Sequence, residues 1–73
     1  MKKPKYKLGD IIRRPFCYAE LVITEIANTE SGYVYKVRYI KGVLDGLCIT
    51  KTEKKLKQYH YKRIDNILVK KNS

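Results

Sequence analysis

The chain has 73 residues, enough for a single domain with a small core. Its 44% hydrophobic content is typical of a globular protein and excludes global disorder. Seventeen Lys and Arg against seven Asp and Glu give a net charge of +10, which favours a polyanionic partner such as DNA, RNA, an anionic lipid surface or an acidic protein. Net charge alone does not specify function, and a need for solubility or a Lys-rich composition would explain the same charge.

The N-terminal stretch 1–7 is basic and is broken by Pro4, so we expect it to be disordered. No apolar segment follows it that would make it a signal peptide. Two cysteines, Cys17 and Cys48, are too few for the disulfide framework of a small secreted domain. The longest aliphatic runs, 21–23 and 67–69, fall far short of the roughly 18 residues that indicate a membrane span. These features predict a cytoplasmic protein with reduced thiols and no membrane span.

The first half of the chain predicts two strands and a hairpin. Residues 11–14 are β-branched enough for a first strand, which Pro15 ends or places at a sheet edge. Residues 18–27 predict a second strand whose alternation slips at Ile26, which indicates a bulge or bend. The turn-forming cluster 28–32 then predicts a hairpin loop of about three to five residues.

Residues 33–40 give the clearest pattern in the chain, because apolar and charged side chains alternate with the period of a half-buried strand. One face is expected to look inward: Tyr33, Tyr35, Val37 and Tyr39. The other is expected to look outward: Val34, Lys36, Arg38 and Ile40. This strand is the foundation of the predicted fold.

The next stretch predicts a turn, a short strand and the start of a helix. Asp45-Gly46 suits a type I′ turn, in which both central residues have positive φ. Residues 47–50 follow as a short strand. Thr50 and Glu53 have the spacing of a capping box, so a helix is expected to begin near residue 51.

Two structures compete for the remaining residues. Apolar residues at helical spacing would line one face of a single helix running to about residue 69. Turn-forming and β-forming residues favour instead a short helical turn over 51–58 and a final strand near 59–64. We adopt the second arrangement and expect residues 70–73 to form a disordered tail. The predicted fold class is therefore mainly β, with about five strands and one helical turn, in a single domain over residues 8–69.

The order of these segments resembles that of the small SH3-like barrels, a broad group that includes Tudor and KOW domains and many phage and bacterial proteins. The resemblance covers roughly residues 7–60 and rests on four segments: Leu8-Gly9-Asp10-x-Ile12, Ile23-x-x-Ile26, Tyr35-x-Val37-x-Tyr39 and Glu53-x-x-Leu56-x-x-Tyr59. It implies a small antiparallel barrel, whose closure would remove exposed strand edges. It implies no function, since such barrels host unrelated roles.

The chain departs from two functions known in this group. Phe16, Tyr18 and Tyr39 lack the spacing of the aromatic cage with which Tudor domains bind methylated cations, and the chain has no Trp. The acidic loop with which SH3 domains bind Pro-rich peptides has no counterpart here. Methyl-lysine binding and Pro-rich peptide binding are therefore excluded from the expectations.

Groups for catalysis or metal binding are sparse. The one histidine, His60, has no serine partner in a triad motif, and a nucleophilic pair with Cys17 is less plausible than two cysteines that act as small buried hydrophobic residues. Cys17, Cys48 and His60 also lack metal-ligand spacing. We expect no enzymatic activity, no cofactor and no metal.

Clustered basic residues interleaved with tyrosines are the remaining feature. They predict a non-enzymatic nucleic-acid-binding accessory module of bacterial or phage type that neutralises phosphates and stacks unpaired bases. The strand 33–40 and the turn 51–57 are expected to form one positive surface. The predicted contact residues are Arg13, Arg14, Tyr18, Tyr33, Lys36, Arg38, Lys41, Lys54, Lys55 and Lys57.

Two other functions stay open. An adaptor or inhibitor that docks on an acidic protein would use Val34 and Ile40 as the apolar centre of its patch. A basic amphipathic helix lying on an anionic membrane would require residues 51–69 to form one helix. The oligomeric state is not predicted.

Overall fold

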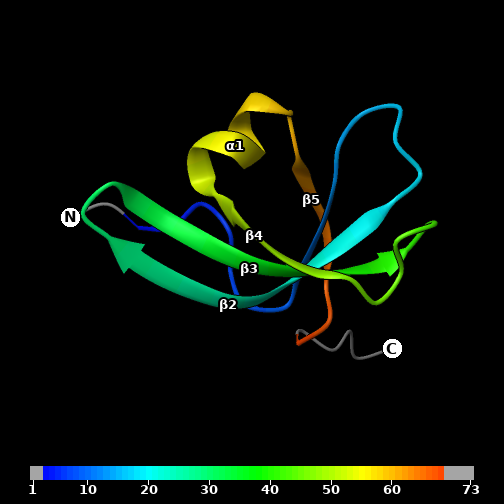
Figure 1. The fold of residues 1–73 in the computed structure, drawn as a ribbon, viewed down its shortest axis with the longest axis horizontal. Coiled ribbons are helices and arrows are strands. Elements are labelled where there is room, and N and C mark those ends of the chain that lie inside the picture. The colour runs from blue at the N-terminus through cyan, green and yellow to red at the C-terminus, as the bar shows by residue number, and fades with distance from the viewer. Residues whose placement is uncertain (1–2, 69–73) are drawn as a thin grey trace.

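A computed structural model describes residues 3–68 as five antiparallel strands and one short helix, which confirms the mainly β fold class. The elements are β1 (Asp10–Arg13), β2 (Glu20–Thr29), β3 (Gly32–Lys41), β4 (Cys48–Thr52), α1 (Glu53–Gln58) and β5 (Lys62–Asn66). The strands form one sheet in the order β4-β3-β2-β1-β5, with α1 between its two edge strands in the sequence (Figure 1).

The sheet curls around one core but does not close. β4 pairs only with β3 and β5 pairs only with β1, so the two edge strands have no hydrogen-bonded partner on their outer sides within the described chain. The expected barrel closure is therefore not present, because α1 and the residues after it connect β4 to β5 without pairing them.

The β2–β3 hairpin confirms the central prediction from the sequence. Tyr35 and Val37 are fully buried, Tyr33 and Tyr39 pack against the core, and Lys36 is exposed on the opposite face. The hairpin loop is shorter than predicted because β2 and β3 pair up to the end residues of both strands, which leaves a two-residue turn. The expected bulge is present, but the register shifts between Ile23 and Glu25, ahead of the predicted position.

The core contains a residue that the sequence analysis placed in a disordered tail. Tyr6 is 2% exposed, and its ring meets that of Tyr35 edge-on with centroids 5.4 Å apart. Its hydroxyl donates to the Tyr61 backbone oxygen at 2.9 Å. The prediction of disorder over residues 1–7 is therefore wrong for Tyr6, because one aromatic ring anchors an otherwise exposed lysine-rich segment. Residues 1–2 and the predicted tail 70–73 lie outside the described residues.

Helix α1 begins two residues later than predicted. Thr52 is its N-cap, and the Thr52 hydroxyl accepts a hydrogen bond from the Lys55 backbone N–H at 3.1 Å. The predicted capping box at Thr50 is therefore wrong, and the Glu53 side chain accepts instead from the Tyr35 hydroxyl at 2.6 Å. Leu56 is the buried residue of the helix and packs it onto the core.

The chain leaves the helix sharply and continues into β5. His60 takes a left-handed backbone conformation with φ of 62°, which ends the helical path after Tyr59. The last strand therefore begins at Lys62, later than the predicted 59–64. The alternative of one helix over 51–69 is wrong, since residues 62–66 are extended.

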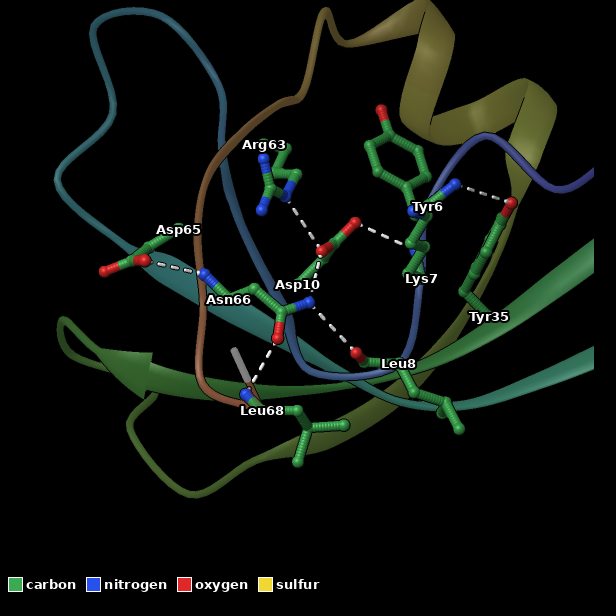
Figure 2. A network of polar contacts seen from close by, with 9 residues as sticks. All are labelled: Tyr6, Lys7, Leu8, Asp10, Tyr35, Arg63, Asp65, Asn66 and Leu68. Carbon is green, nitrogen blue, oxygen red and sulfur yellow. Dashed lines mark hydrogen bonds and ion pairs between the residues drawn. The ribbon is translucent and has the colours of Figure 1, made fainter. Parts of the chain in front are cut away.

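A polar cluster around the buried Asp10 joins the first strand in the chain, β1, to the last, β5 (Figure 2). Asp10 is 1% exposed and its carboxylate accepts from the Lys7 backbone N–H at 2.8 Å, Asn66 Nδ2 at 2.6 Å and Arg63 Nε at 3.0 Å. Burial acts to raise the pKa of Asp10, but these hydrogen bonds and the Arg63 charge outweigh it and lower the pKa. We call Lys7, Asp10, Arg63 and Asn66 the Asp10 network.

Candidate nucleic-acid interface

The sheet separates the predicted contact residues instead of gathering them. Leu56 packs α1 on the face of β3 that holds Tyr35 and Val37, so Lys36 and Arg38 point to the opposite face. The predicted single surface formed by the strand face and the helical turn is therefore wrong. The physical reason is that successive side chains of a strand point to opposite faces. Tyr35 and Val37 face the helix, so Lys36 and Arg38, which alternate with them, point away from it.

The loops that follow β1 and β3 lie together at one end of the molecule, away from the β2–β3 turn (Figure 1). Glu20, the first residue of β2, pairs with Lys41, the last residue of β3. Ala19 and Gly42 consequently adjoin, and a Cβ built on Gly42 would lie 3.1 Å from the Ala19 Cβ. We call residues 13–19 together with 41–47 the loop end.

Three predicted contact residues meet at the loop end. The Lys41 ammonium lies 4.6 Å from the centre of the Tyr18 ring, and Tyr18 is 71% exposed. The Glu20 carboxylate lies 3.6 Å from the same ammonium and 3.7 Å from the Arg13 guanidinium. Arg13, Tyr18 and Lys41 are thus brought together around one half-buried carboxylate.

A second cation–aromatic group contains Arg14, which follows Arg13 of the first group in the sequence. Arg14 lies 5.5 Å from the centre of the Tyr59 ring, and Lys51 lies 5.9 Å from the same centre. The sequence analysis missed Lys51 and Tyr59, since no spacing rule links a strand residue to the residue after a helix. We call the two groups together the cation–aromatic strip: Arg13, Arg14, Tyr18, Lys41, Lys51 and Tyr59.

The strip has a clear positive excess. Of its four cations, only Arg13 and Lys41 form ion pairs within residues 3–68, and both pair with the same carboxylate, that of Glu20. Neither Arg14 nor Lys51 forms an ion pair with a carboxylate of residues 3–68. A group of cations beside exposed rings with so little neutralisation attracts anions strongly.

Large apolar side chains lie beside the strip in full contact with solvent. Phe16 and Val43 are completely exposed, one from each loop, and Phe16 has φ of 61°.

In the second loop the Leu47 N–H donates to the Leu44 oxygen at 2.9 Å. The predicted type I′ turn is wrong there, because Gly46 takes a positive φ and Asp45 does not.

Tyr33, Lys54 and Lys57 line a different site, an open groove of about 730 Å³ between the β2–β3 turn and the first turn of α1. Glu30 and Glu53 line the same groove, so its carboxylates match its lysines in number. Burial acts to raise the pKa of Glu53, but hydrogen bonds from Tyr35 and from the Lys5 N–H lower it, which keeps the carboxylate charged. The groove therefore favours polyanions less than the strip does.

The last predicted residues are dispersed. Lys55 projects from α1 into solvent, and Lys36 lies 3.4 Å from the Glu25 carboxylate, which offsets its charge. Arg38 is exposed on the same outer face as Lys36. These residues do not join the strip.

The two cysteines are less buried than expected. Cys48 is exposed and Cys17 is partly exposed, and both are free thiols. Hydrogen bonds from the Ala19 backbone N–H and from Arg14 lower the pKa of the Cys17 thiol. The expectation of two buried hydrophobic cysteines is therefore wrong.

Comparisons with known proteins give no information on function, so the strip is the main evidence for it. The chain matches no protein-family model, no curated protein and no solved structure. Within residues 3–68, no three His, Cys, Asp or Glu side chains lie close enough together to hold a metal ion. In the same part of the chain, the only helix is far too short to cross a membrane.

Proposed function

We propose that this protein is a non-enzymatic nucleic-acid-binding accessory module of bacterial or phage type, related to the small SH3-like barrels, that acts in the cytoplasm. One observation supports the proposal above the others: four cations and two exposed tyrosine rings form two neighbouring cation–aromatic groups, linked by Arg13 and Arg14, with one carboxylate among them. Its free thiols suit a reducing compartment.

The chemistry of the strip suits a phosphate backbone. Arg14 and Lys51 have no described carboxylate to satisfy them, so phosphates can replace water around both without breaking an ion pair. Lys41 holds its charge next to the exposed ring of Tyr18, so one ligand can meet a cation and an aromatic face together. Contacts of this kind position a nucleic acid with weak sequence preference.

An adaptor that docks on an acidic protein is the second candidate. Its expected apolar centre, Val34 and Ile40, is half-buried rather than exposed, which leaves it less surface than the sequence suggested. Phe16 and Val43 favour it, because completely exposed apolar side chains mark interaction sites.

Fluorescence anisotropy with labelled DNA and RNA, at about 50 mM and about 200 mM salt, tests the proposal. We expect affinity to fall steeply with salt, and Arg14→Gln and Lys51→Gln each to reduce the slope of log K against log salt by about one. Lys55→Gln is the matched control, since it removes the same charge from α1 and should change the slope less.

Binding weaker than about 10⁻⁴ M to both nucleic acids at the lower salt would refute the proposal, because ordinary non-specific binding is stronger. Recovery of a stoichiometric acidic protein after nuclease treatment, together with that weak binding, would favour the adaptor. Equal effects of the Lys55→Gln and Arg14→Gln variants would place the contact outside the strip.

A further inference from the structure

Phe16 has two properties that do nothing for the fold. Its ring is completely exposed, so it gains nothing from burial, and its φ of 61° lies in the left-handed region that bulky residues rarely adopt. Strained backbone at an exposed aromatic is typical of a ligand-binding position, because selection for stability alone would replace it. The side chain is therefore a candidate contact residue.

Phe16 is not alone at the loop end. Tyr18 follows two residues later and is 71% exposed, and Val43 from the adjoining loop is completely exposed. The cations Arg13, Arg14 and Lys41 lie within the same two segments, where the one Glu20 carboxylate offsets only part of the charge of Arg13 and Lys41. Exposed aromatic residues and cations thus occur within a few positions of one another at the loop end, so one ligand can meet both kinds of side chain.

The exposed rings distinguish between the forms of nucleic acid. In a duplex the bases are stacked on one another inside the helix, so an external ring finds no free base face and stays in water. In a single strand each base can offer a face, and stacking on an aromatic ring contributes strongly to affinity whatever the sequence. Cations alone bind both forms, so the rings are the feature that favours the single strand.

An anionic bilayer fits the same surface less well. Asp45 is exposed in the second loop between Leu44 and Gly46, and insertion of that loop would bring its carboxylate toward anionic headgroups. The chain also has no Trp, the residue most enriched with Tyr at membrane interfaces. A polynucleotide needs only side-on contact and leaves Asp45 in solvent.

We propose that the loop end binds single-stranded DNA or RNA in preference to duplex, with bases stacked on Phe16 and Tyr18 and phosphates held by Arg13, Arg14 and Lys41. This inference rests on the proposed function and specifies its ligand. The rings select the single strand, and the cations supply the salt-dependent affinity that both forms share.

The test compares one labelled oligonucleotide as a single strand and annealed to its complement, at one salt concentration. We expect the full chain to bind the single strand at least about tenfold more tightly. Phe16→Ala and Tyr18→Ala should each weaken single-strand binding by about 5- to 100-fold and change duplex binding by less than about twofold.

Three controls separate stacking from damage to the fold. Phe16→Tyr and Tyr18→Phe keep the rings and should retain the affinity. Ile67→Ala removes an exposed apolar side chain away from the loop end and should have no effect. Thermal melting of the Phe16→Ala variant should match that of the unmodified protein, since the ring is in solvent.

The remaining outcomes distinguish failure of this inference from failure of the proposed function. Equal affinity for single strand and duplex, unchanged by the ring variants, would overturn this inference and leave the proposed function standing. Absence of binding to either form would overturn both. Sedimentation with phosphatidylserine vesicles but not with phosphatidylcholine vesicles, lost on Phe16→Ala and without single-strand binding, would assign the loop end to a lipid surface instead.

Discussion

The Asp10 network and the loop end depart in opposite directions from the rule that apolar side chains lie inside and polar ones outside. Asp10 and Asn66 are buried polar side chains with several hydrogen bonds each, and they join the segment before β1 to β5 (Figure 2). Phe16 and Val43 are apolar and completely exposed. The first region stabilises the fold because its buried groups have partners. In the second region the Phe16 and Val43 side chains gain no stability from burial, which leaves them available for a ligand.

The largest expected effect tests whether the segment before β1 belongs to the folded unit. Tyr6→Ala removes a buried ring and its hydrogen bond to Tyr61, and we expect a loss of about 3–5 kcal/mol in the free energy of unfolding. Phe16→Ala, the same kind of truncation at the loop end, should change it by no more than about 0.5 kcal/mol. Urea denaturation of both variants measures the two changes in the free energy of unfolding. Similar losses for Tyr6→Ala and Phe16→Ala would contradict the difference between the two regions.

The Asp10 network should give the fold a specific sensitivity to acid. The pKa of Asp10 is lower in the folded chain than its ordinary value, so its carboxylate stabilises the fold above that value and the contribution is lost as pH falls through the folded pKa. Asp10→Asn should cost about 2 kcal/mol at neutral pH, because hydrogen bonds to a charged acceptor are lost.

The pH dependence of that difference is the measurement. Urea denaturation of the unmodified protein and of the Asp10→Asn variant, from about pH 7 to about pH 2, should show the gap between them closing in acid. A gap that stays constant across this range would show that the charge of Asp10 contributes nothing. Glu53, whose pKa is also lowered, adds an acid-dependent loss common to both proteins.

Two glycines sharpen the comparison at the level of the backbone. Gly9 and Gly46 both have positive φ, but a Cβ on Gly9 would lie 2.6 Å from Leu68 Cγ, whereas a Cβ on Gly46 would meet open space. We expect Gly46→Ala to cost about 1 kcal/mol from strain alone and Gly9→Ala about 2 kcal/mol from strain and crowding. Thermal melting should therefore rank Gly9→Ala as the less stable variant, and the reverse order would contradict the packing beside the Asp10 network.

The smallest effect has the opposite sign. Phe16→Gly relieves the left-handed backbone at that position and loses no burial, although glycine adds entropy to the unfolded chain. The balance should be a gain of about 0.5 kcal/mol in the free energy of unfolding, measured by urea denaturation. A loss greater than about 1 kcal/mol would mean that Phe16 supports the fold after all.

Local alternation was enough to predict the centre of the sheet. In residues 33–40 every second side chain is apolar, and burial of Tyr35 and Val37 follows from that period alone. Tyr6 could not be predicted in the same way, because its partners Tyr35 and Tyr61 are remote in sequence and its neighbours are lysines. The burial of Asp10 was missed for the same reason, since its donors come from both ends of the domain.

The candidate site shows a similar limit. Clusters of basic residues in the sequence indicate that a polyanion could bind, but they do not show which clusters share a surface. Lys36 and the helix lysines were grouped by composition, whereas β3 sends Lys36 to the face opposite α1. Arg14 and Lys51 both lie beside the Tyr59 ring, although the three residues come from the segment after β1, from β4 and from the end of α1, and no residue pattern predicted that meeting.

The pairing of β1 with β5 also determines how the protein can form in a cell. The Asp10–Arg63 contact spans 53 residues, so most of the domain must be made before it closes. The β2–β3 hairpin needs only neighbouring residues and can assemble on the nascent chain while β5 is still inside the ribosome. Until β5 emerges, β1 keeps one backbone edge unpaired, and an unpaired strand edge is a template for aggregation.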